Sequence, residues 1–240
     1  MARTALVTGG TRGIGEAVSV ALHEAGCRVA ANYGGNDERA RDFTGRTGIP
    51  AYRFDVGDFE AVTEGVARIE AELGPVDILV NNAGITRDGT LHRMGFDSWD
   101  DVIRTNLSSC FNCSRAVIEG MRARKFGRIV NIGSINGQGG QYGQVNYAAA
   151  KSGIHGFTKA LAQEGAAQGI TVNAIAPGYV DTDMVRAVPE RVLERIVERI
   201  PVGRLGQARD IARGVVFLTA DDADFITGST LSINGGQHMY

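Results

Sequence analysis

A tyrosine and a lysine four residues apart, Tyr147 and Lys151 in "YAAAK", follow Ser134 in the middle of the chain. On a helix, residues at this spacing share a face, so the lysine ammonium can approach the phenol. A nearby positive charge lowers the pKa of a phenol, which is near 10 in an unperturbed tyrosine. We therefore expect Tyr147 to give a proton to a developing alkoxide, with Ser134 bonded to the same oxygen, in a carbonyl reduction. In isolation, an exposed amphipathic pair would be the alternative.

A glycine-rich segment near the amino terminus supplies a second feature. Residues 8–15 read "TGGTRGIG" and stand between a short apolar segment and a segment with helical spacing. Gly9, Gly13 and Gly15 permit a tight turn and close backbone approach, so a pyrophosphate could bind at the amino terminus of a helix. A plain strand-to-helix turn with glycine at strained positions is the alternative. The place of the motif at the first strand of an alternating chain favours a dinucleotide, which would donate hydride.

The end of the second expected strand decides which dinucleotide suits the chain. Enzymes that use NAD usually carry an acidic residue there for the ribose 2′-hydroxyl. Residues 31–33 read "ANY" and contain no acid, whereas Arg12 stands in the glycine loop and Arg39 follows the strand. Guanidinium groups form charge-assisted bonds with phosphate oxygens, so we expect NADPH, which carries a 2′-phosphate. Alternatively, Arg39 is a solvated helix residue near Asp37 and Glu38.

Short β-branched segments alternate with segments of helical spacing along the whole chain. The expected strands lie at residues 4–8, 27–33, 51–56, 76–82, 127–133, 170–177 and 229–235. Parallel strands need crossover connections, so the alternation predicts an α/β fold with a Rossmann-type, doubly wound parallel sheet of these strands and helices on both faces. No repeat or linker interrupts it, which predicts one domain over residues 1–240. Extra helical sequence at 181–206 is expected to cover a substrate.

The overall composition argues against several classes of function. The 240 residues carry a formal net charge of −2, without the basic excess of a nucleic-acid surface. No apolar segment approaches the roughly 20 residues that cross a bilayer, and no signal peptide is recognisable, so we expect a cytoplasmic protein. The pair Cys110 and Cys113 in "CFNC" lies inside a helical segment and lacks a second Cys or His pair for zinc. We expect these to be small core residues and predict no metal site.

The remaining motifs stand in a definite order along the chain. After "TGGTRGIG" come "NNAG" (81–84), Asn106, Ser134, "YAAAK" (147–151) and "PG" (177–178). Together they resemble the short-chain dehydrogenases/reductases over essentially the whole chain. The resemblance implies a catalytic tetrad of Asn106, Ser134, Tyr147 and Lys151, with a water-mediated link from Asn106 to Lys151, and an adenine contact from Asp55. The residues that it implies for cofactor binding are Gly9, Thr11, Arg12, Gly13, Ile14, Gly15, Arg39, Asp55, Val56, Asn82, Ala83, Gly84, Tyr147, Lys151, Pro177, Gly178 and Val180.

The loop between Ser134 and Tyr147 points to the substrate. It carries Gln138, Gln141 and Gln144, whose amides can bond a second carbonyl or a thioester, as a 3-oxoacyl chain presents. Within the family, "NNAGITRDGTL", this loop, "PGYVDTDMV" and "NGGQHM" are most similar to reductases of acetoacetyl-CoA. The resemblance implies NADPH-dependent formation of (R)-3-hydroxybutyryl-CoA for polyhydroxyalkanoate (polyhydroxybutyrate) synthesis. The residues implied for the acyl-CoA site are Asp88, Gln141, Gln144, Gly178 and Tyr179.

Two other functions stay open at this point. A 3-oxoacyl-[acyl-carrier-protein] reductase of fatty-acid elongation usually presents basic residues before the fifth and sixth strands to its acidic carrier. Here those positions hold Lys125 and Gln168, so half of that patch is absent. A non-catalytic dinucleotide-binding regulatory module is disfavoured because the tetrad is intact. The resemblance also implies a homotetramer in which the helices that carry Asn106 and Tyr147 pack across a twofold axis.

Overall fold

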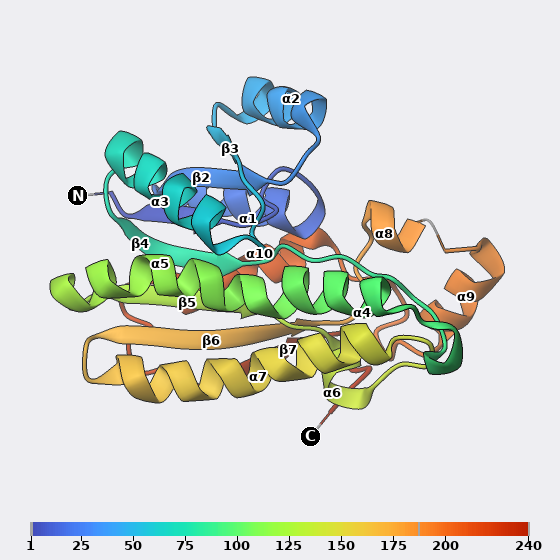
Figure 1. The fold of residues 1–240 in the computed structure, drawn as a ribbon. Helices are drawn as coiled ribbons and strands as arrows, with labels where there is room; N and C mark the ends of the chain where they lie inside the picture. Colours follow the sequence, from blue (N-terminus) through green and yellow to red (C-terminus); the bar gives the residue numbers. More distant parts are fainter. Residues whose placement is uncertain (1, 187, 240) are drawn as a thin grey trace.

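The computed structural model describes residues 2–186 and 188–239 (Figure 1). Within these residues, seven parallel strands form one sheet in the order β3-β2-β1-β4-β5-β6-β7. The strands are β1 (Thr4–Val7), β2 (Arg28–Tyr33), β3 (Ala51–Arg53), β4 (Val76–Asn81), β5 (Gly127–Ile132), β6 (Ile170–Pro177) and β7 (Thr230–Ile233). The predicted doubly wound parallel sheet is confirmed, and β3 shows the largest difference in strand ends.

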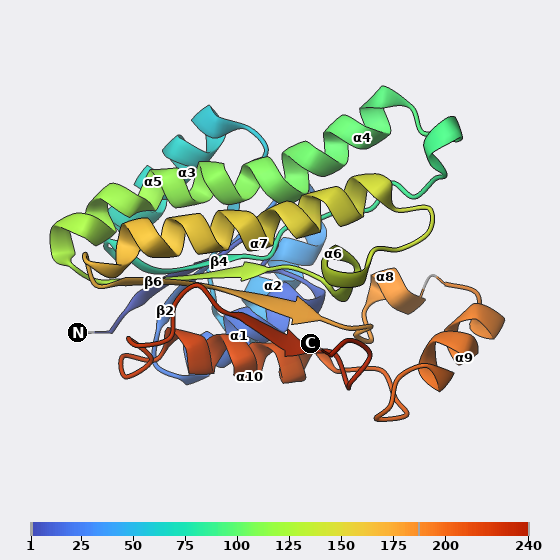
Figure 2. The same ribbon diagram turned by 90° about the horizontal axis from the view of Figure 1, so that it is seen from below.

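Helices cover both faces of this sheet (Figure 2). They are α1 (Gly13–Glu24), α2 (Asp37–Thr47), α3 (Phe59–Leu73), α4 (Phe96–Ile103), α5 (Ser109–Arg124), α6 (Ile135–Gly139), α7 (Val145–Ala166), α8 (Asp183–Arg186), α9 (Glu190–Glu198) and α10 (Ala208–Thr219). A short 3₁₀ helix, η1 (Leu91–Arg93), precedes α4, and a π-helical segment, η2 (Arg104–Ser108), joins α4 to α5. In Figure 2, α3, α5 and α7 lie on one face, and α1 and α10 lie on the other.

Each face of the sheet builds its own hydrophobic core. Alternate side chains of a strand point to opposite faces, so the fully buried strand β1 contributes to both. Ala5 and Val7 pack with apolar residues of α1 and α10, whereas Leu6 packs with those of α3 and α5. Burying one leucine side chain of this kind stabilises the fold by about 1.5–3 kcal/mol. The continuous apolar run "ALV" is therefore the local cause of a strand that is covered on both sides.

Cys110 and Cys113 lie inside α5 and are buried, as predicted for core residues. Burial raises the pKa of the Cys110 thiol to about 11, and it also raises the pKa of the Cys113 thiol. Both groups therefore stay protonated at neutral pH, which disfavours thiolate chemistry. Among the described residues, no cluster of three or more His, Cys, Asp or Glu side chains could hold a metal ion. In that same part of the chain, no helix has the length and apolar character needed to span a membrane.

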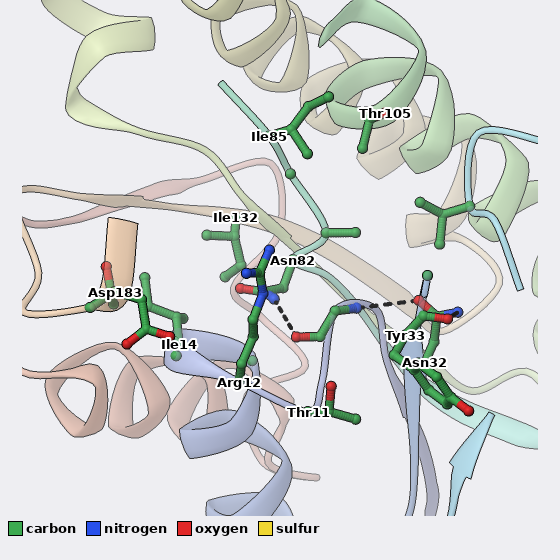
Figure 3. Close-up of a pocket in the computed structure, with 18 of the residues that line it drawn as sticks. Thr11, Arg12, Ile14, Asn32, Tyr33, Asn82, Ile85, Thr105, Ile132 and Asp183 are labelled. Atoms are coloured by element: carbon green, nitrogen blue, oxygen red, sulfur yellow. Dashed lines mark hydrogen bonds between the residues drawn. The ribbon is translucent and has the colours of Figure 1, made fainter. Parts of the chain in front are cut away.

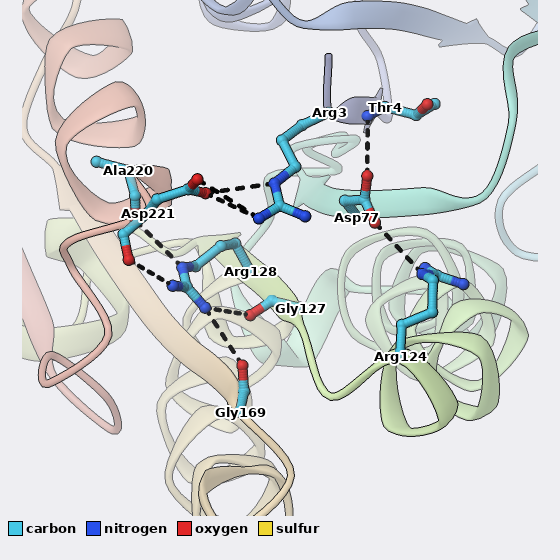
Figure 4. A network of polar contacts seen from close by, with 9 residues as sticks. All are labelled: Arg3, Thr4, Asp77, Arg124, Gly127, Arg128, Gly169, Ala220 and Asp221. Carbon is cyan, nitrogen blue, oxygen red and sulfur yellow. Dashed lines mark hydrogen bonds and ion pairs between the residues drawn. The ribbon is translucent and has the colours of Figure 1, made fainter. Parts of the chain in front are cut away.

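At the amino-terminal end of the strands, a buried arginine ties three segments together (Figure 4). The guanidinium of Arg128, in β5, donates to the carbonyl oxygens of Gly127 (3.0 Å), Gly169 (3.3 Å), Ala220 (3.2 Å) and Asp221 (3.0 Å). These carbonyls belong to the start of β5, the turn before β6 and the segment after α10. The Arg128 side chain therefore joins these three segments at one end of the sheet.

Candidate active site

A cavity of about 480 Å³ lies at the carboxyl ends of the central strands. The chain leaves β1 toward β2 on one side, while β4 lies on the other, so this is the switch point at which doubly wound sheets bind ligands. The structure places every residue that the sequence implied for cofactor binding in the lining of this cavity. These are Gly9, Thr11, Arg12, Gly13, Ile14, Gly15, Arg39, Asp55, Val56, Asn82, Ala83, Gly84, Tyr147, Lys151, Pro177, Gly178 and Val180.

The glycine loop forms a close-packed cradle between β1 and α1. Gly9 and Gly13 have positive φ values of 61° and 53°, which glycine adopts without steric cost. A side chain on Gly15 would collide with the carbonyl oxygen of Gly9. Asn82 holds the loop from the next strand, since its Nδ2 donates to the carbonyls of Thr8 (2.9 Å) and Gly9 (3.3 Å), the latter visible in Figure 3. The cradle and the amino terminus of α1 beside it fit a dinucleotide pyrophosphate.

Asn32 stands at the end of β2, where an NAD enzyme would carry an acid. Its Oδ1 accepts the N–H of Gly9 (3.3 Å), and its Nδ2 donates to the carbonyl of Phe54 (2.9 Å). The buried amide therefore fastens the glycine loop to β2 and β3. Sequence reasoning noticed the missing acid but missed Asn32 and Tyr33 as lining residues, although their position at a strand end was the available signal. In Figure 3, Arg12 stands between these two residues and Asp183.

Arg39, which the alternative interpretation left as a solvated helix residue near Asp37 and Glu38, pairs with a more distant acid. Its Nη2 lies 2.7 Å from Oδ2 of Asp183, which is the first residue of α8. Both residues line the cavity. Arg39 is therefore a residue of the cavity, and a cation stands at the end where the adenosine ribose is expected.

Asp55, the expected adenine contact, is already engaged by two donors. Its carboxylate accepts the N–H of Gly57 (2.8 Å) and a guanidinium N–H of Arg104 (2.8 Å). Partial burial raises the pKa of this carboxyl group, but the two bonds outweigh it and hold the pKa below its usual range. A fixed carboxylate at this place has free lone pairs for a further donor, so the expected contact with an adenine amino group stays a prediction.

The end of β5 and the first turns of α7 bring Ser134, Tyr147 and Lys151 together on the cavity wall. Ser134 caps α6, because its Oγ accepts the backbone N–H of Asn136 (3.1 Å). Lys151 Nζ donates to the carbonyl oxygen of Ile132 (2.7 Å) and lies 5.7 Å from the centre of the Tyr147 ring. The three residues therefore line the same cavity, and the ammonium is fastened to the strand.

The pKa shifts in this cluster differ from the sequence expectation. Burial raises the pKa of Tyr147, while a hydrogen bond with Ser134 acts in the opposite direction. Burial also lowers the pKa of Lys151 to about 8. The expected lowering of the Tyr147 pKa is wrong for this structure, because desolvation of the phenol outweighs its hydrogen bond with Ser134. A raised pKa keeps Tyr147 protonated at neutral pH, and this is the form that donates a proton.

Asn106 lies in η2 and is completely buried behind the cavity wall, so it does not line the cavity itself. Its Oδ1 accepts the N–H of Ile85 (2.8 Å), and its Nδ2 donates to the carbonyl of Ile85 (2.9 Å). Gly84 lies beside both Asn106 and Lys151: a Cβ on it would lie 3.4 Å from Asn106 Oδ1 and 3.7 Å from Lys151 Nζ. The implied water link between Asn106 and Lys151 stays a prediction.

Two of the residues expected at the acyl-CoA site are bonded to each other. Gln144 Nε2 donates to Asp88 Oδ2 (2.9 Å), and Asn136 Nδ2 donates to Gln144 Oε1 (2.9 Å). Asn136 was missed from the sequence, and its position in α6 beside Ser134 carries no local motif. Gly178 lines the cavity, whereas Asp88, Gln141, Gln144 and Tyr179 lie outside its lining. Their contact with a substrate stays a prediction.

A doubly wound parallel sheet with a dinucleotide cradle and a Ser, Tyr and Lys cluster defines an oxidoreductase that uses a nicotinamide dinucleotide. Residues 9–238 match a family model described as enoyl-(acyl carrier protein) reductase. The chain belongs to the short-chain dehydrogenase/reductase family.

Curated relatives match the chain over nearly its whole length. It is 65% identical over 240 residues to an acetoacetyl-CoA reductase of Rhizobium meliloti (strain 1021), covering 100% of both chains. It is 60% identical over 239 residues to one of Paracoccus denitrificans, covering 99% of each. It is 47% identical over 239 residues to the 3-oxoacyl-[acyl-carrier-protein] reductase FabG of Salmonella typhimurium, covering 99% of this chain and 98% of that protein. The predicted enzyme class is confirmed, and the non-catalytic alternative has no support.

Proposed function

We propose that this protein reduces the 3-oxo group of acetoacetyl-CoA with NADPH and forms (R)-3-hydroxybutyryl-CoA. One observation carries the reaction type: Ser134, Tyr147 and Lys151 meet at one wall of a cavity whose other wall is the dinucleotide cradle. The names of the relatives at 65% and 60% identity support the substrate. The R configuration follows the family resemblance. The product would supply polyhydroxyalkanoate synthesis.

Each polar residue of the catalytic wall has a separate role in the proposed reduction. The nicotinamide, when bound, supplies hydride to the carbonyl carbon. Ser134 and Tyr147 direct hydroxyl protons at the carbonyl oxygen, where negative charge develops. The N–H of Asn136 bonds Ser134 Oγ and makes its hydroxyl a better donor. Tyr147 then gives its proton to the alkoxide, and the Lys151 ammonium, about one helical turn away, stabilises the resulting phenolate.

The charges at the adenosine end of the cavity support NADPH over NADH. Arg12 and Arg39 both line this cavity and can bond a 2′-phosphate. Asn32 occupies the place of the NAD-type acid, and both ends of its amide are used by the backbone. A ribose 2′-hydroxyl therefore lacks its usual carboxylate partner at this strand.

A homotetramer is part of the same proposal. The family resemblance places the helices that carry Asn106 and Tyr147 at a twofold axis. Large apolar side chains are exposed on the two helices that flank Asn106: Phe96 (76% exposed) and Trp99 (38%) on α4, and Phe111 (53%) on α5. Exposed aromatic residues on neighbouring helices are typical of subunit contacts.

Acyl-carrier protein is the alternative thioester carrier, favoured by the relative at 47% identity. The discriminating experiment compares kcat/KM for acetoacetyl-CoA and acetoacetyl-acyl-carrier protein, each with NADPH and with NADH. We expect at least a tenfold preference for the CoA ester and for NADPH. A preference for the carrier would move the protein to fatty-acid elongation, and inactivity with both would remove the proposed substrate.

A further inference from the structure

The ion pair between Arg39 and Asp183 joins two distant segments across the cavity. Arg39 is in the first turn of α2, directly after β2, and Asp183 begins α8, in the segment after β6. The two side chains meet at 2.7 Å although 144 positions separate them in the chain. Both keep substantial exposure, 41% for Arg39 and 60% for Asp183, so solvent and ligands can reach the pair.

The other nearby acids have different partners. Asp37 accepts a bond from the hydroxyl of Tyr33 (3.0 Å) and pairs with Arg53 (3.1 Å). Asp181, two residues before Asp183, accepts two bonds from Arg186, at 2.7 and 3.0 Å. Asp183 is therefore the carboxylate that the fold brings to the Arg39 guanidinium.

A carboxylate and a phosphate compete for the same face of a guanidinium, because both use its forked N–H donors. The Asp183 carboxylate thus stands where an anionic group of a ligand would bond Arg39. A nucleotide without a 2′-phosphate has no group that needs this cation and can leave the pair intact. A nucleotide with one must displace Asp183 or bind beside its negative charge.

We propose that Asp183 is a specificity-determining residue, which competes with the cofactor 2′-phosphate for Arg39 and links cofactor binding to the position of α8. This inference rests on the proposed preference for NADPH. Displacing Asp183 from Arg39 lowers the affinity for the 2′-phosphate. When the phosphate binds, this displacement also frees α8, at the start of the 181–206 segment, from α2. NADH, in contrast, leaves the segment tied to α2.

Binding of 2′,5′-ADP and of 5′-AMP, measured by calorimetry without turnover, tests the proposal. Asp183→Asn should lower the dissociation constant for 2′,5′-ADP by about threefold to tenfold at low salt. It should change the dissociation constant for 5′-AMP by less than about 1.5-fold. Asp181→Asn removes the same charge two residues away and is the matched control, expected to leave both dissociation constants nearly unchanged. In an Arg39→Ala background, Asp183→Asn should have no effect on 2′,5′-ADP, because the competed cation is gone.

The outcomes separate this inference from the cofactor proposal. If the unmodified protein prefers 2′,5′-ADP but Asp183→Asn binds it no more tightly, competition is refuted and the NADPH preference stands. If Asp183→Asn binds 5′-AMP more tightly by the same factor, or if Asp181→Asn gains the same affinity for 2′,5′-ADP, a general charge effect is at work and the competition is also refuted. If the unmodified protein binds 2′,5′-ADP and 5′-AMP equally, the preference and the competition both fail.

Discussion

The Lys151 ammonium is a buried cation that donates to a neutral carbonyl oxygen, that of Ile132. Its pKa of about 8 lies well below the value of an exposed lysine because burial penalises the charged form. The site therefore holds a positive charge at a cost in stability, and it does so at the position where charge would stabilise a phenolate.

This cost predicts a pH dependence. Above pH 8 the native protein gives up the Lys151 proton, while the unfolded chain keeps it to about pH 10.5, so unfolded chains bind more protons and stability rises with pH. The free energy of unfolding should therefore rise by about 2–3 kcal/mol relative to Lys151→Met between pH 7 and pH 10. Urea unfolding at both pH values measures this. Lys159→Met, at an exposed position of the same helix, is the control. If the difference in unfolding free energy between the parent and Lys151→Met is the same at pH 7 and pH 10, the explanation is wrong.

The conformation of the glycine loop requires the backbone of Gly15 to lie close to the carbonyl oxygen of Gly9. Gly15→Ala would force a methyl group against the Gly9 carbonyl and should lower 2′,5′-ADP affinity at least tenfold and stability by about 2–3 kcal/mol. Gly45→Ala, in an exposed part of α2 with no neighbour within 4 Å of the added methyl, should instead stabilise by about 0.5–1 kcal/mol. Calorimetric titration and thermal unfolding measure both effects. Unchanged nucleotide binding by Gly15→Ala would show that the loop is not the cradle.

The strand-end network opposite the cavity makes a prediction for the fold alone. Arg128→Met removes the guanidinium that donates to four backbone carbonyls, of which those of Gly169 and Ala220 keep a backbone N–H donor. The substitution should lower the free energy of unfolding by about 2–4 kcal/mol. Arg115→Met is the matched control, because Arg115 is exposed and pairs with Glu119, one turn along α5. Its free energy of unfolding should lie within about 0.5 kcal/mol of that of the parent. Equal effects in urea unfolding would mean that the carbonyl contacts contribute little.

Local sequence patterns could predict the strands, the glycine turn and the common face of Tyr147 and Lys151, because all of these depend on residues close in sequence. They could not predict the Arg39 pairing with Asp183, which only the folded sheet brings together. They also gave the wrong direction for the pKa shift of the Tyr147 phenol. Helical spacing places Lys151 near Tyr147 but does not reveal that the Ile132 carbonyl takes the ammonium. Burial, a property of the whole fold, then decides the direction of the pKa shift.

At the scale of the whole molecule, the exposed aromatic residues of α4 and α5 predict a subunit contact. Phe111, which stacks on Phe59 with ring centres 6.3 Å apart, is more than half exposed in the single chain. Phe111→Glu should convert a four-chain assembly to smaller species in light scattering, because it places a charge in an apolar contact. Val192→Glu, on α9, is the control and should keep the mass of the parent. A monomeric parent protein at micromolar concentration would contradict the tetramer.

We propose that one cavity brings together a dinucleotide, a 3-oxoacyl thioester and the Tyr147 proton. The measurement that tests it most directly is single-turnover oxidation of NADPH by acetoacetyl-CoA, in the parent protein and in Tyr147→Phe, with 2′,5′-ADP binding measured alongside. We predict rapid oxidation by the parent, a rate about 10³-fold lower in the variant, and dissociation constants for 2′,5′-ADP within twofold of each other. An equal rate in the two proteins, or no oxidation by the parent, would contradict the account.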